Sequence, residues 1–202
     1  MISIYQLKPA FQNLLRPMVQ RYARAGVTAN QVTLIAMVIS IALGACLYWL
    51  GRSNLTLFLV LPVWMFVRMA FNAVDGMLAR EHNQQSPLGS FLNELSDVVS
   101  DAALYLPFCL IAPFTPLGIF AVIWFAALSE MTGALGPMIG ARRQYQGPMG
   151  KSDRAFVFGA LGLWVGLGFE LHPLLIWLPW LLCCLMMVNI AARIKVALRE
   201  IQ

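Results

Sequence analysis

Charge is what this sequence has least of. Only 11% of its 202 residues are charged, whereas soluble domains carry roughly a quarter. A chain in which 60% of residues are hydrophobic has too little polar surface to face water on all sides. Several runs exceed about 18 mostly apolar residues, which is the length that indicates a membrane-spanning helix. The composition therefore predicts one all-α integral membrane domain over residues 1–202, and it excludes a soluble protein.

Cysteine is also scarce, and it is not arranged for metal binding or for cross-links. The four cysteines lie in apolar runs and show no metal-type pair spacing, so we expect small core or lipid-facing residues and no disulfide framework. No cleavable signal peptide is evident. The first long apolar run begins near Val27, after a basic stretch, and we expect it to be retained as a membrane span.

The apolar runs predict six transmembrane helices within residues 28–195. Their expected ranges are about 28–50, 55–80, 88–111, 117–138, 153–169 and 173–195. Residues 4–24 precede them and combine apolar residues at helical spacing with a basic face, which is typical of an amphipathic helix in the membrane interface. The apolar positions are Tyr5, Leu7, Phe11, Leu14, Leu15, Met18 and Tyr22, and the basic ones are Lys8, Arg16, Arg21 and Arg24. The alternative is a solvated cytoplasmic arm.

The basic residues predict the orientation. Twelve of the 14 Lys and Arg lie in the N-terminal segment, the loops after the second and fourth spans, and the C-terminus. The other side has only Arg52, and Arg68 lies within the second span. Because positive charge stays on the cytoplasmic side, both termini should be cytoplasmic. The net charge of +5 follows from this distribution and needs no nucleic-acid partner.

Polar residues inside the second and third spans repeat at spacings that place each set on one helix face. Both sets lie toward the cytoplasmic ends of their spans. Ionisable groups inside a membrane cost about 2.5–3.5 kcal/mol each on insertion scales, so a cluster implies a function or mutual pairing. Matched by depth, the layers pair Asp75 with Asn93, Asn72 with Asp97, and Arg68 with Asp101.

These layers differ in what they predict. Arg68 and Asp101 are opposite in sign and deepest, which favours a structural ion pair. Asp75 and Asp97 would repel each other unless a cation lies between them. Carboxylate and amide oxygens are ligands that suit Mg²⁺, Mn²⁺ or Ca²⁺. The two carboxylates therefore predict a metal site at the cytoplasmic end of the spans.

The same residues fall in a long pattern with fixed gaps. It reads Asp75-Gly76-x-x-Ala79-Arg80, then eight residues, then Gly89-x-x-x-Asn93-x-x-x-Asp97. This resembles the signature of the CDP-alcohol phosphotransferases, D-x-x-D-G-x-x-A-R-x8-G-x-x-x-D-x-x-x-D. The six-span layout, the interfacial N-terminal helix and the stretch VTANQVTL are similar as well.

The resemblance implies a membrane-embedded homodimer, which we expect in the bacterial inner membrane with its active site facing the cytoplasm. Such enzymes move a phospho-alcohol group from a CDP-linked donor to a hydroxyl and release CMP. Here we expect CDP-diacylglycerol as donor and a small polar alcohol as acceptor. The family's four aspartates hold two divalent cations, and the last is the base for the acceptor hydroxyl. Asp75 would be a metal ligand, Asp97 a ligand and general base, and Gly76, Ala79, Arg80 and Gly89 the donor site.

The sequence departs from the signature at two of the four aspartates, which are Asn72 and Asn93. Each asparagine keeps an oxygen but loses a negative charge. The donor diphosphate could restore the balance, only one Mg²⁺ or Mn²⁺ could bind tightly, or Glu94 or Asp101 could help. Asp101 is the better candidate because it shares the Asp97 face. The expected ligands are therefore Asp75, Asp97, Asn72, Asn93 and Asp101, for one or two cations.

The loop between the fourth and fifth spans carries the expected acceptor site. Arg142, Arg143, Lys151 and Arg154 would surround the N-terminus of the fifth span, an arrangement suited to a phosphate. The acceptor would then itself be phosphorylated. The alternative is ordinary anchoring of a cytoplasmic loop by positive charge.

Two other classes of protein compete with an enzyme. A non-catalytic relative that binds a CDP-lipid or a partner protein is favoured by the asparagine pair. A small transporter is disfavoured, because the carboxylates cluster at one membrane face and not at the midplane.

Overall fold

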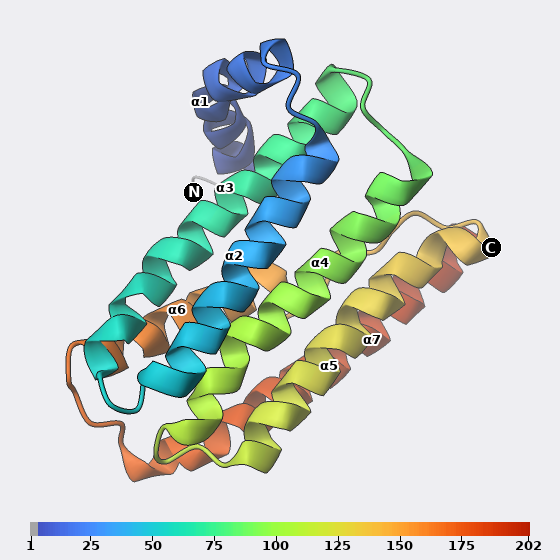
Figure 1. Ribbon diagram of the computed structural model, residues 1–202. Coiled ribbons are helices and arrows are strands. Elements are labelled where there is room, and N and C mark those ends of the chain that lie inside the picture. The colour runs from blue at the N-terminus through green and yellow to red at the C-terminus, as the bar shows by residue number, and fades with distance from the viewer. Residues whose placement is uncertain (1–3) are drawn as a thin grey trace.

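The computed structural model describes residues 4–202, and their side chains from residue 10 onward. This range forms seven α-helices linked by loops and four short 3-10 segments, without a strand (Figure 1). The helices are α1 (Ile4–Arg24), α2 (Ala29–Leu50), α3 (Val60–Glu81), α4 (Pro87–Tyr105), α5 (Pro116–Leu135), α6 (Lys151–Gly166) and α7 (Leu178–Glu200). The 3-10 segments are Leu55–Leu59, Leu106–Leu110, Gly136–Ile139 and Pro173–Trp177. The all-α prediction is confirmed.

Four helical segments are long and apolar enough to cross a membrane, which supports an integral membrane protein. They are Ala29–Leu50, Leu55–Glu81, Pro116–Ile139 and Pro173–Glu200. Helices α4 and α6 occupy the other two expected positions but fall short of this description. Helix α4 carries Glu94, Asp97 and Asp101, and α6 has only 16 residues.

Polar residues fix where several helices begin. The Thr28 hydroxyl accepts a hydrogen bond from the Gln31 backbone N–H, and the Gln31 side chain accepts one from the Thr28 N–H. This reciprocal cap satisfies backbone donors that the first turn of α2 would otherwise leave unpaired. Helix α4 begins in a similar way, with Ser86 as cap and Pro87 in the first turn. Both caps lie at the end of the bundle that holds the polar residues of α3 and α4.

Helix α1 uses part of its apolar face to pack on α3. Val19 is fully buried, and it contacts a cluster that includes Val74 and Leu78 of α3. On another side of α1, Leu14 is 75% exposed. The N-terminal segment is therefore helical as predicted, with one side committed to the bundle. The expected positions Tyr5, Leu7 and Lys8 fall outside the described side chains.

Helix α2 lies between α3 and α4 and packs against both (Figure 1). Its approach to α4 is close, because a Cβ atom on Gly44 would collide with the Ala103 carbonyl group. Helices α5 and α7 pair with each other, and α6 packs against α3. A large apolar core that includes Phe58, Phe108 and Phe158 fills the part of the bundle near the C-terminal end of α2. At the N-terminal end of α2, Ala29 and Val32 belong to the smaller apolar cluster around Val19, and Thr33 is a buried polar residue beside them.

All four cysteines are free thiols, as the sequence predicted. Gly162 and Gly166 allow close helix packing. Gly162 lies against Leu61, and Gly166 lies against Leu59. These contacts bring α6 onto the start of α3 within the chain.

Candidate active site

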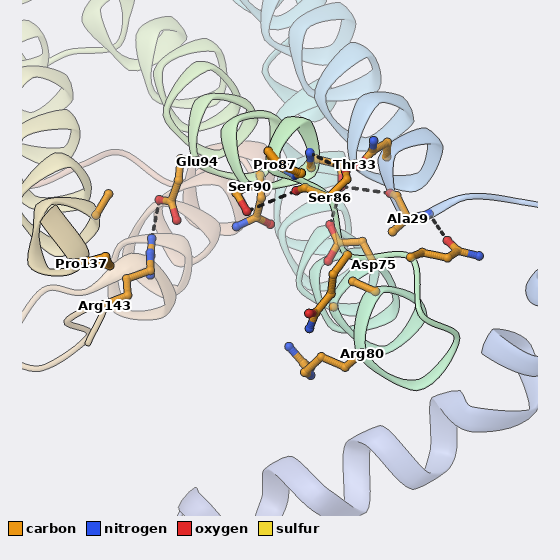
Figure 2. A pocket seen from close by; sticks show the side chains of 18 residues that line it. Ala29, Thr33, Asp75, Arg80, Ser86, Pro87, Ser90, Glu94, Pro137 and Arg143 are labelled. Atoms are coloured by element: carbon orange, nitrogen blue, oxygen red, sulfur yellow. Dashed lines mark hydrogen bonds and ion pairs between the residues drawn. The ribbon is translucent and has the colours of Figure 1, made fainter. Parts of the chain in front are cut away.

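A cavity of about 840 Å³ opens where the N-termini of α2 and α4 meet the C-terminal end of α3 (Figure 2). This volume is in the range of small-molecule sites, about 300–1,000 Å³. Its walls include six positions of the sequence signature, which are Asp75, Gly76, Ala79, Arg80, Gly89 and Asn93. The structure therefore brings together all four expected donor-site residues with two of the expected metal ligands.

Asp75 is the buried carboxylate of this cavity, with 5% of its surface exposed. Its Oδ2 accepts a hydrogen bond of 2.7 Å from the hydroxyl of Thr33, one of the α2 residues that line the cavity (Figure 2). The sequence analysis missed Thr33. A signal was present, since Thr33 and Ser40 repeat at i, i+7 within the apolar run that follows Gln31, and such a polar stripe faces the protein interior.

Side chains at the two signature glycines would crowd neighbouring residues that line the cavity. A Cβ atom on Gly76 would lie 3.1 Å from both terminal nitrogens of the Arg80 guanidinium. One on Gly89 would lie 2.8 Å from Oδ1 of Asn30. Arg80 is itself exposed, so its positive charge lies beside the Gly76 backbone at the cavity edge and remains in contact with solvent.

Asp97 lies behind the cavity and is enclosed by hydrogen-bond donors. Its Oδ1 forms an ion pair with Lys151 of α6. The same oxygen lies 3.3 Å from Nη2 of Arg68 and 3.5 Å from Nδ2 of Asn72. Arg68 also donates to the Asp97 backbone carbonyl at 3.1 Å. The predicted layer of Asn72 and Asp97 is thus present, with two cations added to it.

Asp101 lies one turn deeper and belongs to an ion-pair network. Its Oδ1 lies 2.5 Å from Nη1 of Arg68, and its Oδ2 lies 3.1 Å from Nη2 of Arg154. The predicted Arg68–Asp101 pair is therefore confirmed. Each carboxylate oxygen of Asp101 is paired with a guanidinium group. Neither oxygen is therefore free to bind a metal ion, although Asp101 was an expected ligand.

The four basic residues expected at the acceptor site do not form one cluster. Arg143 lines the cavity, Lys151 pairs with Asp97, and Arg154 is fully buried. Arg142 is exposed, and its backbone N–H donates to Glu200 at 2.8 Å. Only Arg143 of the four faces the expected donor site.

Acidic partners that the sequence analysis did not assign to Arg143 explain this arrangement. Arg143 Nη2 lies 2.5 Å from Glu94 (Figure 2). The same nitrogen lies 3.4 Å from Glu130. Burial disfavours the charged form, but the hydrogen bond and charge of Glu94 outweigh it and hold the pKa of Arg143 above its ordinary value. Glu130 also lies 3.0 Å from Nη2 of Arg154, so one buried carboxylate pairs with both arginines.

The side chains fit a divalent cation at one of the two places that four aspartates would create. Asp75 and Asn93 line the cavity and present oxygen atoms, which suit Mg²⁺ or Mn²⁺. At Asp97 the Oδ1 atom already meets two cationic side chains. Over residues 4–202, no group of three or more His, Cys, Asp or Glu side chains is placed to hold a metal ion. Any cation here must share its shell with amide oxygens or with a ligand.

Comparisons with known proteins agree with this geometry. Residues 26–188 match the family described as CDP-alcohol phosphatidyltransferase. The chain is 45% identical over 179 residues to the inner membrane protein YnbA of Escherichia coli (strain K12), covering 89% of this chain and 85% of YnbA. It is 30% identical over 112 residues to the archaetidylinositol phosphate synthase of Aeropyrum pernix, covering 50% of this chain and 57% of that protein.

A solved enzyme has the same fold. The phosphatidylinositol phosphate synthase of Mycobacterium tuberculosis with CDP-DAG bound superposes with a TM-score of 0.71 at 18% identity, covering 90% of this chain and 92% of that one. The same enzyme in complex with manganese and citrate gives 0.68 at 19% identity, covering 90% and 87%. The match over residues 26–188 shows that this chain belongs to the CDP-alcohol phosphatidyltransferase family, whose members are transferases of phosphate-containing groups.

Proposed function

We propose that the protein transfers a phosphatidyl group from CDP-diacylglycerol to the hydroxyl of a small polar alcohol and releases CMP. The observation that carries this proposal is that one cavity is lined by six residues of the family signature, which are Asp75, Gly76, Ala79, Arg80, Gly89 and Asn93. The mycobacterial enzyme of the same fold was solved with CDP-DAG bound, which supports the choice of donor.

We further propose that helices α2 to α7 all span the membrane, with α1 lying in the interface. Pairing of their charges inside the bundle would let α4 and α6 cross despite their acids and bases. The cavity would face the cytoplasm, because the loops and helix ends around it carry most of the basic residues. Similarity to an inner membrane protein supports a bacterial inner membrane location. A homodimer remains the family-based expectation.

The donor would bind in the cavity with its diphosphate close to the backbone at Gly76 of α3 and Gly89 of α4. Arg80 would contribute a positive charge to the phosphates, and small Ala79 would leave room for the nucleotide. Asp75, with an oxygen of Asn93, would hold one Mg²⁺ or Mn²⁺ against the diphosphate. When bound, such a cation neutralises charge that develops on the leaving phosphate.

Asp97 would act as the general base. Each contact on the Asp97 carboxylate among the described side chains is made by Oδ1, so Oδ2 is the atom left for the acceptor hydroxyl. The hydroxyl oxygen would form a bond to the lipid-linked phosphorus as its proton passes to Asp97. The bridging P–O bond of the diphosphate would break, and CMP would leave with that oxygen.

Arg143 supports a phosphorylated acceptor, such as glycerol 3-phosphate or an inositol phosphate. It is the basic side chain of the loop that lines the cavity, and a phosphate could replace Glu94 as its partner. The relatives named archaetidylinositol phosphate synthase and phosphatidylinositol phosphate synthase support the same choice. Arg142, Lys151 and Arg154 have no part in this contact.

A non-catalytic CDP-lipid-binding relative is the second candidate, and it is favoured by the asparagines at positions 72 and 93. The purified protein incubated with CDP-diacylglycerol, Mn²⁺ or Mg²⁺ and a panel of alcohols separates the two. We expect CMP release that requires both a cation and one class of alcohol. Donor binding without CMP release for any alcohol would support the binding protein instead.

A further inference from the structure

We propose that the ammonium group of Lys151 takes the place of a second divalent cation at Asp97, so that the protein holds a single metal ion, at Asp75. This proposal rests on the proposed donor site, but it concerns the number of metal ions and not turnover. The family signature has four carboxylates, and this chain has two of them. Lys151 lies next to one of the two that are left.

The contacts on Asp97 leave no room for a metal at Oδ1. That oxygen meets the Lys151 ammonium, the Arg68 guanidinium at 3.3 Å and the Asn72 amide nitrogen at 3.5 Å. These three donor groups stabilise the negative charge on Oδ1, which a bound cation would otherwise do. A divalent ion at the same atom would face two positive charges within a buried site, where like charges repel strongly.

Lys151 is held in place by its neighbours along the chain. It is the first residue of α6, and the Gly150 N–H before it donates to the Asp153 carboxylate at 3.0 Å. Arg154, one turn later, is fully buried between Asp101 and Glu130 and also donates to the Met149 carbonyl at 3.1 Å. The start of α6 is therefore fixed on both sides of Lys151, which directs its side chain to Asp97.

Asp75 has the opposite surroundings. Among the described side chains, the uncharged hydroxyl of Thr33 donates to Asp75, which lines the cavity together with Asn93. A divalent ion there meets a carboxylate, an amide oxygen and, once the donor is bound, a diphosphate. The two asparagines remove negative charge from the site, and the lysine adds positive charge. Both changes lower the number of divalent ions that the site can bind.

Lys151 also orients the Asp97 carboxylate for its proposed role as general base. Lys151 and Arg68 hold Oδ1 and leave Oδ2 as the free oxygen for the acceptor proton. In a two-metal site a cation would orient this carboxylate. Here side chains from α3 and α6 do so.

The test is a count of bound Mn²⁺ by electron paramagnetic resonance, with the whole purified protein saturated with CDP-diacylglycerol and no alcohol present. We expect one Mn²⁺ per chain. Asp75→Asn should lose it, and Asp97→Asn should keep it. Two bound ions in the unaltered protein, none at all, or loss of the ion in Asp97→Asn would each overturn the proposal.

A gain of binding tests Lys151 itself. The triple variant Asn72→Asp, Asn93→Asp, Lys151→Met should bind two Mn²⁺ per chain. The pair of aspartate substitutions with Lys151 in place should bind one, and so should the same pair combined with Lys195→Met, a change at an exposed lysine of α7. A second ion without removal of Lys151 would contradict the proposal, as would a folded triple variant that binds one. Failure of the proposed function would instead appear as missing CMP release with one Mn²⁺ bound.

Discussion

The hydroxyl of Thr33 on α2 lies 2.7 Å from Oδ2 of Asp75 on α3, and it links the two helices at the wall of the cavity. A hydrogen bond to a charged group stabilises it by about 1.5–3 kcal/mol. The hydrogen bond from Thr33, which is not part of the family signature, therefore orients the Asp75 carboxylate in the cavity.

Thr33→Val removes this hydrogen bond and keeps the shape of the side chain. We expect a Mn²⁺ dissociation constant raised by roughly tenfold, equivalent to about 1.4 kcal/mol, because the carboxylate loses its fixed orientation. Thr132→Val is the matched control, since Thr132 bonds to the Leu128 carbonyl of its own helix outside the cavity. Equal Mn²⁺ affinity in the two variants would show that Thr33 does not position Asp75.

Arg68→Met breaks a buried pair and leaves Asp101 and Asp97 short of a positive partner. Removal of one member of such a pair costs about 3–5 kcal/mol. We expect a large fall in the thermal unfolding midpoint in detergent. Arg16→Met, which breaks the exposed pair of Arg16 and Glu81, should cost less than about 1 kcal/mol. Similar midpoints for the two variants would contradict the structural role of Arg68.

Asp97→Asn should abolish CMP release while the protein stays folded. A neutral amide cannot take the acceptor proton, although it preserves the size of the side chain. CMP release is the measurement, with the unfolding midpoint as the check on folding. Turnover near that of the unaltered protein would remove Asp97 from the role of base.

Gly89→Ala should weaken donor binding. The added methyl group would lie 2.8 Å from Oδ1 of Asn30, so that side chain must move within the cavity wall. We expect the dissociation constant for CDP-diacylglycerol to rise by about tenfold, or about 1.4 kcal/mol. Gly159→Ala is the matched helix control, because its methyl group would make only ordinary contacts, the nearest at 3.6 Å to Pro62. Equal donor affinity in the two variants would count against the proposed donor wall.

The sequence predicted those parts of the site that lie on a single helix. Helical spacing alone places Arg68 and Asp75 on one face of α3, and Asp97 and Asp101 on one face of α4. Opposite charge at equal depth then predicts the Arg68–Asp101 pair. The family signature added Gly76 and the other cavity residues, which the structure places around one cavity.

Contacts that depend on the path of a loop were not predictable in this way. The segment 140–150 turns Arg143 toward Glu94 and leads into α6, which brings Lys151 to Asp97. Gly140, Gly147 and Met149 have positive φ angles, which determine the path of this loop. Hydrophobic periodicity carries no information about such a path. Loop composition alone predicted one acceptor cluster. In the structure Lys151 pairs with Asp97, whereas Arg143 and Arg154 share Glu130.

The central claim is transfer of a phosphatidyl group, and its most direct measurement is the ratio of two products. The unaltered protein is incubated with CDP-diacylglycerol, Mn²⁺ and the alcohol that gives CMP release, and both CMP and the new phospholipid are quantified by mass spectrometry. We expect equal amounts of the two, and neither product when Asp75→Asn replaces the unaltered protein. CMP accompanied by phosphatidic acid, in an amount independent of the alcohol, would show hydrolysis and contradict the account.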